Sequence, residues 1–143
     1  MSDWISFYDL RHSLIYVNDR HRDVHYRTIA QDICEYVPSS DAQVMDYGCS
    51  EATSAVLLAE ACAHLTMVEA APTVRGALNS RYSGNSKISV LSPEEAAARP
   101  PQSFDLIVLH SVAQYLTAAQ FDDLLVTFHR LLKSGGLLIV GDI

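Results

Sequence analysis

The sequence predicts a doubly wound α/β domain, in which helices cover both faces of a parallel β-sheet. Two observations predict this fold class. Apolar runs alternate with helical patterns after residue 40, and one run, residues 105–110, is apolar almost throughout. Such alternation is typical of parallel strands joined by crossover helices, and a central strand covered on both faces is apolar along its length. With 143 residues, of which 49% are hydrophobic and 19% charged, the chain can bury the core of one such domain.

The apolar runs and the residues that bound them place the elements along the chain. Five strands are expected, at residues 43–47, 64–69, 87–91, 105–110 and 137–140. The helices between them are expected at residues 53–63, 72–82, 93–99 and 118–132. Pro72 suits a first helical turn, Thr117 is a suitable N-cap, and the segment Lys133–Gly136 is a helix stop.

A further helix is expected ahead of the sheet, over residues 23–37, with Val24, Ile29, Ile33 and Val37 facing inward. Residues 1–40 are therefore expected to form an N-terminal helical segment packed on the sheet. Residues 41–143 would form the ligand-binding domain.

Composition excludes several classes of partner and site. The net charge of −7 argues against a nucleic-acid partner, since binding phosphates needs a basic surface. The three cysteines (Cys34, Cys49 and Cys62) are odd in number and lack the spacing of metal ligands, so no metal site is expected and a reducing cytosol is favoured. No apolar stretch approaches the roughly 20 residues that cross a bilayer, and the start of the chain does not resemble a signal peptide. A cytoplasmic protein without membrane contact is expected.

The turn after the first strand and the end of the second are the strongest candidates for a binding site. A doubly wound sheet binds ligands at the carboxyl ends of its strands. The turn begins with Asp46 and has small residues at alternate positions up to Ala52, which lets a backbone approach a ligand closely. The second strand ends in Glu69, where a carboxylate can accept both hydroxyls of a ribose. The pattern favours nucleoside binding, although any strand–helix–strand unit can have small residues in its turn and an acid at a strand end.

These segments resemble the motifs of class I S-adenosylmethionine-dependent methyltransferases, which have a Rossmann-like fold. Val44–Ala52 is similar to their first motif, an acid followed by Gly-x-Gly-x-Gly, and Leu65–Pro72 to their second. Ser103–Leu116 resembles their fourth-strand motif and Leu131–Ile139 the segment that leads into their fifth strand. The resemblance covers residues 24–143 and implies the strand order 3-2-1-4-5. Asp46 separates the pattern from that of a nicotinamide-dependent dehydrogenase, so a nucleotide-binding oxidoreductase fragment is the less favoured interpretation.

The resemblance also implies roles for individual residues. Asp46 would orient the turn near the methionine amine of the cofactor, and Gly48 with the backbone of Cys49 and Ser50 would face its methionine part. Glu69 would hold the ribose hydroxyls. The remaining implied contacts are Ala70 on the adenine, Ser92 and Glu94 at the adenine edge, and His110 beside the path of the methyl group. The implied cofactor is S-adenosyl-L-methionine, with S-adenosyl-L-homocysteine as the product.

The sequence departs from the family pattern at three places. Ser50 and Ala52 stand where the second and third glycines of the motif occur, which leaves cofactor binding plausible but weakened. Ser92 stands where an aspartate is common, and Pro93 lacks an N–H group that often meets the adenine. The sixth and seventh strands of the family are absent, so the sequence is expected to be a fragment, or else to cover its exposed fifth strand by forming a homodimer.

Several alternatives remain open from the sequence. His110 is a candidate general base or a hydrogen-bonded structural residue, and Tyr115 would line the substrate pocket or pack in the core. Four aromatic residues near the N-terminus would form a lid over the cofactor or a plain apolar face: Trp4, Phe7, Tyr8 and Tyr16. The turn after the fourth strand lacks the Asn/Asp-Pro-Pro-Tyr pattern of enzymes acting on nucleobase or glutamine amino groups, so a small-molecule methyl acceptor is expected. The alternative is a non-catalytic module that binds the cofactor or a protein partner.

Overall fold

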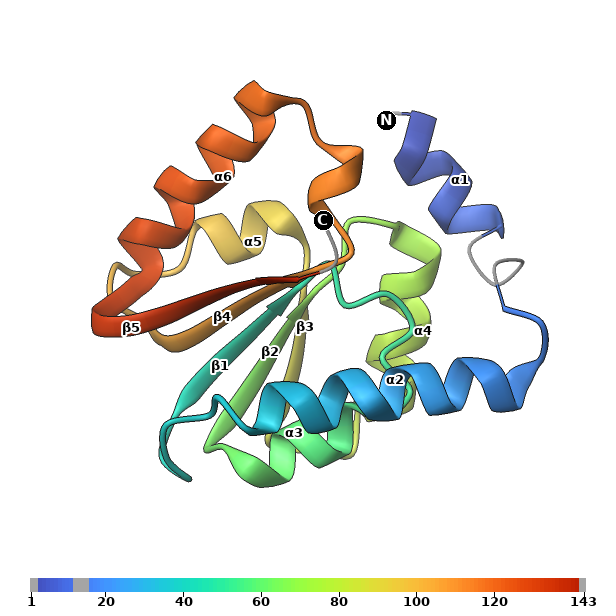
Figure 1. The fold of residues 1–143 in the computed structure, drawn as a ribbon, viewed down its shortest axis with the longest axis horizontal. Helices are drawn as coiled ribbons and strands as arrows, with labels where there is room; N and C mark the ends of the chain where they lie inside the picture. The colour runs from blue at the N-terminus through green and yellow to red at the C-terminus, as the bar shows by residue number, and fades with distance from the viewer. Residues whose placement is uncertain (1–2, 12–15, 142–143) are drawn as a thin grey trace.

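The computed structural model of the chain describes residues 3–11 and 16–141, which form one five-stranded sheet with helices on both faces (Figure 1). The strands are β1 (Gln43–Tyr47), β2 (His64–Val68), β3 (Ile88–Leu91), β4 (Phe104–His110) and β5 (Leu132–Gly141). All strand pairs are parallel, in the order β3-β2-β1-β4-β5. The doubly wound α/β fold and the strand order implied by the resemblance are both confirmed.

The helices are α1 (Asp3–Arg11), α2 (Asp19–Cys34), α3 (Ala55–Ala61), α4 (Pro72–Tyr82), α5 (Pro93–Ala97) and α6 (Ala118–Leu131), with a 3₁₀ turn η2 (Ala113–Tyr115) after β4. Helices α2, α3 and α4 pack on one face of the sheet, where their side chains share a buried cluster with Val44, Leu65 and Leu106. Helices α5 and α6 pack on the other face, around Met45 and Ile107. None of the helices in the described part of the chain is long and apolar enough to cross a membrane.

The strand order reverses at β1, which positions the site. Strand β1 pairs with β2 on one side and with β4 on the other, and the helices that follow β1 and β4 lie on opposite faces. The connections therefore diverge above the carboxyl ends of these strands and leave a crevice there. Figure 1 shows α1 lying beyond this end of the sheet.

Helix α2 differs from the prediction in its bounds and in its buried face. It begins at Asp19 because Asn18 is its N-cap, with Asn18 Oδ1 accepting a hydrogen bond from the His21 N–H at 2.9 Å. The inward placement of Val24 was wrong, since this side chain is 55% exposed. The predicted burial of Ile33 is confirmed, and Ile29 and Val37 pack partly buried against the same cluster. Tyr26 and Ala30 are the other buried residues of the helix. The apolar pattern missed this face because its largest member, Tyr26, has a polar hydroxyl that finds its partners in a distant turn.

Strand β5 begins five residues earlier than the predicted residue 137, directly after α6. The pairing jumps from Phe104 opposite Leu132 to Leu106 opposite Leu137, so the predicted helix stop forms a bulge at the start of the strand. Gly135, at φ +78°, allows the backbone of this bulge to turn. Strand β5 is at the edge of the sheet and its Leu137 is 45% exposed.

Candidate active site

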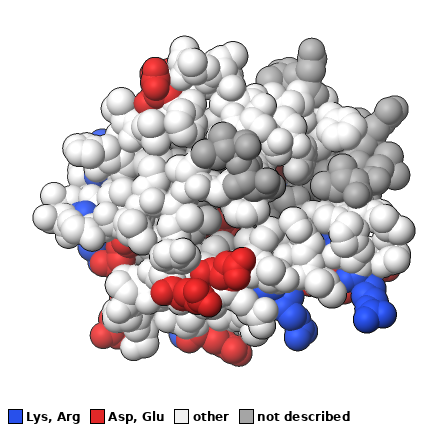
Figure 2. Space-filling view, viewed as in Figure 1, with Lys and Arg blue, Asp and Glu red and all other residues white. Residues whose placement is uncertain are grey.

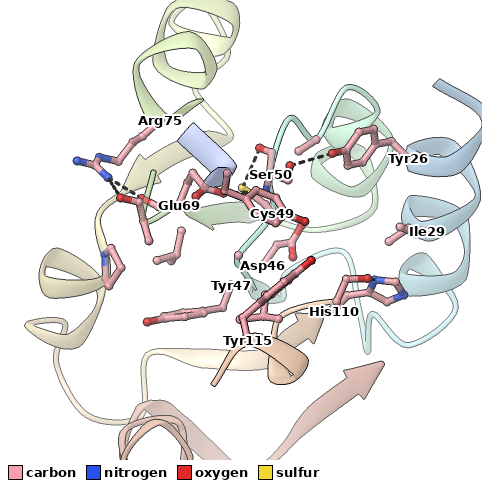
Figure 3. A pocket seen from close by; sticks show the side chains of 18 of the residues that line it. Tyr26, Ile29, Asp46, Tyr47, Cys49, Ser50, Glu69, Arg75, His110 and Tyr115 are labelled. Atoms are coloured by element: carbon pink, nitrogen blue, oxygen red, sulfur yellow. Dashed lines mark hydrogen bonds between the residues drawn. The ribbon is translucent and has the colours of Figure 1, made fainter. Parts of the chain in front are cut away.

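A cavity of about 950 Å³ lies at the carboxyl ends of β1, β2 and β4, beneath α1 and beside α2 (Figure 3). Its volume is at the upper end of the range for small-molecule sites, roughly 300–1,000 Å³. The cavity is lined by Asp46, Gly48, Cys49, Ser50, Glu69, Ala70, Glu94 and His110, which are all the predicted site residues except Ser92. They lie together because the carboxyl ends of neighbouring parallel strands share one edge of the sheet.

The turn after β1 has a left-handed backbone at three alternate positions. The φ angles are +78° at Gly48, +53° at Ser50 and +39° at Ala52. These are the positions at which glycine recurs in the motif that the sequence resembles. A left-handed backbone costs a residue with a Cβ atom about 1–2 kcal/mol, so Ser50 and Ala52 maintain the turn at an energetic cost. The turn therefore has the glycine-type conformation although two of the glycines are replaced.

Gly48 is the position in this turn that has no room for a side chain. A Cβ atom built on it would lie 2.2 Å from Cγ2 of Val112, which follows β4. The close approach brings the β1 turn against the β4 turn at the floor of the cavity. Only glycine fits both this approach and the positive φ angle.

Glu69 ties the end of β2 to the turn. Its Oε2 accepts a hydrogen bond from the Ser50 N–H at 2.9 Å, and its Oε1 accepts one from the Ala71 N–H at 2.8 Å. These bonds account for a carboxylate that is only 5% exposed. Each carboxylate oxygen has a second lone pair, so Glu69 can also accept hydrogen bonds from a ligand in the cavity.

Helix α2 contributes a residue that the sequence analysis did not identify. The Tyr26 hydroxyl donates a hydrogen bond to Ser50 Oγ at 3.0 Å and accepts one from the Glu51 N–H at 3.3 Å. Tyr26 also lines the cavity. No spacing rule links a helix residue to a turn more than 20 positions later, so only the tertiary structure reveals the contact.

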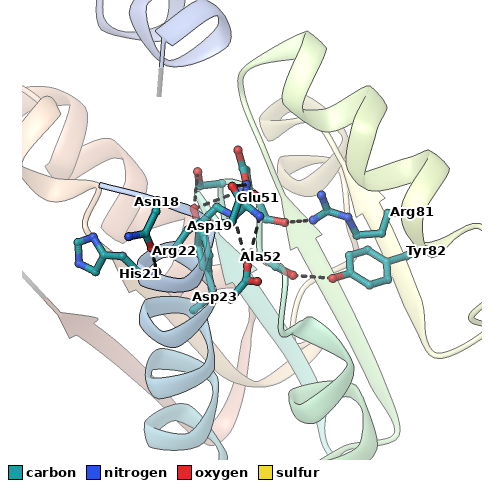
Figure 4. A network of polar contacts seen from close by, with 11 residues as sticks. Asn18, Asp19, His21, Arg22, Asp23, Glu51, Ala52, Arg81 and Tyr82 are labelled. Carbon is teal, nitrogen blue, oxygen red and sulfur yellow. Dashed lines mark hydrogen bonds and ion pairs between the residues drawn. The ribbon is translucent and has the colours of Figure 1, made fainter. Parts of the chain in front are cut away.

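The outer side of the turn is held by side chains from α2 and α4 (Figure 4). Arg22 lies 3.3 Å from a carboxylate oxygen of Glu51, and the Arg81 guanidinium donates to the Glu51 carbonyl at 2.6 Å. The Tyr82 hydroxyl donates to the Ala52 carbonyl at 2.6 Å. The turn is thus anchored on two sides by polar contacts to its backbone and side chains.

Asp46 lies at the carboxyl end of β1 near a second acid. Burial, together with the negative charge of Glu69, raises the pKa of Asp46 from its ordinary value of 3.8 to about 7. Burial, with the charges of Asp46 and Glu69, also raises the pKa of the Cys49 thiol well above its usual range. Cys49 is therefore a neutral thiol at physiological pH and not an activated nucleophile.

The raised pKa predicts a pH-dependent stability gain for Asp46→Asn. The folded protein binds the Asp46 proton more tightly than the unfolded chain, so ionisation opposes folding increasingly as the pH rises from about 4 to about 7. We expect Asp46→Asn to match the wild type in urea unfolding near pH 4. At pH 8 it should be more stable by about 1–3 kcal/mol, because the amide carries no charge to desolvate. If the difference in the free energy of unfolding between Asp46→Asn and the wild type is the same at pH 4 and at pH 8, Asp46 has an ordinary pKa in the folded protein.

His110 lies at the end of β4 and lines the cavity. Its Nδ1 is 2.8 Å from Ser111 Oγ, and its ring packs against Gly141 of β5, where a Cβ atom would lie 2.8 Å from the ring Cδ2. Ser111 has a left-handed backbone, with φ +56°. The hydrogen bond and the contact with β5 fix the orientation of the imidazole at the cavity wall.

Helix α1 contacts both the β4 turn and α4. The Trp4 ring stacks on Tyr115 with centroids 5.7 Å apart, and Tyr8 meets the edge of Tyr115 at 5.5 Å. Asp9 accepts hydrogen bonds from the N–H and the hydroxyl of Thr73, at 2.7 and 2.9 Å, and so caps the first turn of α4. The cavity is lined by Trp4, Tyr8, Tyr16 and Tyr115, whereas Phe7 is 46% exposed and does not line it.

At the β3 end of the site, Ser92 is occupied as the N-cap of α5. Its Oγ accepts a hydrogen bond from the Glu95 N–H at 3.2 Å, and Glu95 Oε2 accepts one from the Ser92 N–H at 2.7 Å. Pro93 and Glu94 line the cavity in its place. Within the described residues, no cluster of three or more His, Cys, Asp or Glu side chains could hold a metal ion.

Comparisons with known proteins agree with this arrangement. A sequence model of the methyltransferase domain family matches residues 45–140. No sequence among curated proteins matches the chain significantly. Three similar solved structures illustrate the fold. Haemonchus contortus phosphoethanolamine N-methyltransferase 1 has a TM-score of 0.75 and 18% sequence identity, and the match covers 96% of this chain and 30% of that chain. The [4+2]-cyclase SpnF has a TM-score of 0.76 and 18% identity, with 94% of this chain and 57% of that chain covered. A Leishmania major SAM-dependent methyltransferase has a TM-score of 0.73 and 17% identity, with 95% of this chain and 58% of that chain covered.

At identities of 17–18%, these structural similarities establish the fold alone. The chain spans between 30% and 58% of the length of the three proteins. The family assignment rests on the sequence match, which extends from β1 to β5 and includes the turn at Gly48, the end of β2 and the β4 turn. The chain belongs to the methyltransferase domain family.

Proposed function

We propose that the chain binds S-adenosyl-L-methionine and transfers its methyl group to a small molecule, leaving S-adenosyl-L-homocysteine. The observation that supports this most directly is the turn at residues 48–52, which has left-handed backbone at all three glycine positions and lies against Glu69 in the cavity. The Haemonchus enzyme with this fold was solved in complex with S-adenosylhomocysteine. Family membership and the shape of the turn together favour cofactor binding at this edge of the sheet.

The residues that line the cavity fit the parts of this cofactor. We assign the turn from Gly48 to Ser50 to its methionine part and Asp46 to the neighbourhood of the amine, whose positive charge would favour the ionised carboxylate. We assign Glu69 to the ribose hydroxyls, and Ala70 with Glu94 to the adenine. Ser92 is left out of the assignment because it caps α5.

When bound, the cofactor supplies an electrophilic methyl group, which an acceptor takes by direct displacement as the carbon–sulfur bond breaks. The chain itself needs no covalent step. Its contribution is to hold the two reactants in position and to exclude water, which can provide much of the rate acceleration. Trp4 and Tyr8 of α1 line the cavity, and Asp9 joins α1 to α4. We propose that residues 1–40 form an N-terminal helical segment packed on the binding domain of residues 41–143.

We propose His110 as the general base for acceptors that lose a proton. It lines the cavity, and its hydrogen bond to Ser111 holds the imidazole in place, as a base must be held to meet its substrate. An acceptor that is already deprotonated would not need it.

A small acceptor is supported by the cavity and by the charge of the chain. The cavity is enclosed by α1 and aromatic side chains, which suits a compact molecule. The chain has a net charge of −7, and the face in Figure 2 shows acidic and basic side chains in separate small groups instead of a continuous basic surface. Phosphates of a nucleic acid would find few counter-charges among these described residues.

Two further proposals concern the location of the protein in the cell and its oligomeric state. The three cysteines are free, which favours a reducing, cytoplasmic location. Strand β5 presents an unpaired apolar edge within the described residues, so a second copy of the chain could pair with it as a homodimer.

Turnover separates the proposed enzyme from a binding module. The purified chain would be incubated with S-adenosyl-L-methionine and a panel of small amines, phenols and thiols, and the S-adenosyl-L-homocysteine formed would be measured by mass spectrometry. Product that depends on one acceptor class and matches the methylated acceptor in amount would support the enzyme. Cofactor binding without turnover on any acceptor would favour the non-catalytic module, and so would a product amount that does not depend on acceptor.

A further inference from the structure

We infer that Tyr26 is a positioning residue for the cofactor turn, and that α2 thereby takes over part of the role that glycine has at position 50 in the family motif. The inference rests on the proposed function, because the turn matters for activity only if it binds the cofactor. It concerns residues outside the motif, since Tyr26 precedes the first strand.

Ser50 is held from two opposite directions. Its side-chain oxygen accepts the Tyr26 hydroxyl at 3.0 Å, while its backbone N–H donates to Glu69 at 2.9 Å. The two contacts come from α2 on one side and from the end of β2 on the other. A residue fixed at both its side chain and its backbone is held in the left-handed conformation that serine otherwise disfavours.

The Tyr26 hydroxyl also reaches the next residue of the turn, because it accepts the Glu51 N–H at 3.3 Å. One buried hydroxyl thus uses both its donor and an acceptor position on consecutive residues. Tyr26 is 7% exposed, so a hydroxyl at this place requires such partners. The hydroxyl is neutral at physiological pH and can donate, and burial raises the pKa of Tyr26 further above its ordinary value.

A tyrosine hydroxyl also contacts the turn at Ala52, the other position where glycine is replaced. Ala52 has φ +39°, and its carbonyl accepts the buried Tyr82 hydroxyl of α4 at 2.6 Å. Each non-glycine residue with a left-handed backbone in the turn is therefore fixed by a tyrosine hydroxyl from a different helix. Tyr82 lies outside the cavity lining, which makes it a matched control for the loss of a buried hydroxyl beside the turn.

The inference predicts that the effect of losing the Tyr26 hydroxyl depends on the residue at position 50. Tyr26→Phe should raise the hydrogen-exchange rates of the Ser50 and Glu51 amides in the ligand-free protein by about three- to tenfold, and should weaken S-adenosyl-L-methionine binding by a similar factor. Ser50→Ala should have the same effects on the amide at position 50 and on cofactor binding, because it loses the Tyr26 contact and retains the Cβ atom. The Glu51 N–H keeps its acceptor in this variant. Ser50→Gly should weaken binding less than Ser50→Ala does, since glycine adopts the turn without support.

A crossed set of double variants gives the sharpest test. Tyr26→Phe should cost less than about twofold in affinity when combined with Ser50→Gly, but its full cost when combined with Ala52→Gly. Tyr82→Phe should cost little affinity when combined with Ala52→Gly, but its full cost when combined with Ser50→Gly. If Tyr26→Phe weakens binding equally in the wild type and with Ser50→Gly, Tyr26 contacts the cofactor itself or acts only through the core, and the inference is overturned.

The exchange measurement distinguishes failure of this inference from failure of the proposed function. It uses the ligand-free wild type and variants, so it reports the turn whether or not S-adenosyl-L-methionine binds. Faster exchange of the amide at position 50 in Tyr26→Phe that is absent in its Ser50→Gly combination would support the positioning role even if calorimetry showed no cofactor binding. The Glu51 N–H loses its acceptor in both Tyr26→Phe backgrounds, so its exchange is not used for this comparison. Unchanged exchange at Ser50 and Glu51 would contradict it even if the wild type binds the cofactor.

Discussion

Gly48→Ala is expected to lower the free energy of unfolding by about 2–5 kcal/mol and to abolish binding of S-adenosyl-L-methionine. Two effects add at this position. The φ angle of +78° strains any residue with a Cβ atom by about 1–2 kcal/mol, and that atom would lie 2.2 Å from Val112. Relieving such overpacking typically costs about 1–3 kcal/mol and would push the β1 turn away from the β4 turn. Urea unfolding and calorimetric titration measure the two consequences separately.

Gly76 provides a matched control in the same domain. It lies within α4, and a Cβ atom built on it meets nothing within 4 Å apart from its chain neighbours and the nearby backbone of its own helix. Gly76→Ala should therefore stabilise the protein by about 0.5–1 kcal/mol, because alanine favours a helix, and leave cofactor binding unchanged. If Gly48→Ala were as stable as Gly76→Ala and bound the cofactor normally, the claim that position 48 has no room for a side chain against Val112 would be contradicted.

Glu69→Ala is expected to weaken S-adenosyl-L-methionine binding by about 1–3 kcal/mol through loss of charge-assisted hydrogen bonds to the ribose. The structure adds a second consequence. The variant leaves the N–H groups of Ser50 and Ala71 without their acceptor, so it should also lower the free energy of unfolding by about 1–3 kcal/mol. Glu69→Gln retains one oxygen and should fall between the wild type and Glu69→Ala in both measurements.

Glu60→Ala is a suitable comparison, because Glu60 is exposed on α3 and should change stability by no more than about 0.5 kcal/mol. An unchanged cofactor affinity in Glu69→Ala would contradict the assignment of Glu69 to the ribose hydroxyls. A loss of affinity without a loss of stability would instead show that the bonds to Ser50 and Ala71 contribute little in the ligand-free protein.

Much of the sheet could be predicted from local sequence because its signals are short. The predicted bounds of β1 and α4 agree with the structure, since each is marked by an apolar run or a proline next to turn residues. The start of β5 could not be predicted in this way. Its bulge depends on pairing with β4 and on an ion pair between Lys133 and Asp105, which the sequence separates widely.

The cavity residues at strand ends could likewise be anticipated, because parallel strands place their carboxyl ends together. Asp46, Gly48 and Glu69 were found from this rule and from the family motif. Tyr26 and Arg75 were not, since each acts through a contact made only after folding. Arg75, on the first turns of α4, donates to the carbonyls of Glu69 and Ala70 at 2.7 and 3.1 Å.

Ser50 and Ala52 show how the structure changes the interpretation of a motif. In the sequence they are losses of glycine that weaken the case for a cofactor site. In the structure both have the left-handed backbone that glycine would adopt, and each is fixed by a tyrosine hydroxyl. The conformation of the turn is thus retained by tertiary contacts, which a local pattern does not encode.

Calorimetric titration of the chain with S-adenosyl-L-methionine and S-adenosyl-L-homocysteine, with NAD as the control, tests the central claim most directly. We predict binding of the first two with one site per chain and a dissociation constant on the order of micromolar, and no binding of NAD. Circular dichroism of the same sample would establish that the chain is folded. A folded chain that binds neither S-adenosyl compound would contradict the account, and the cavity would then belong to a domain that no longer binds the cofactor.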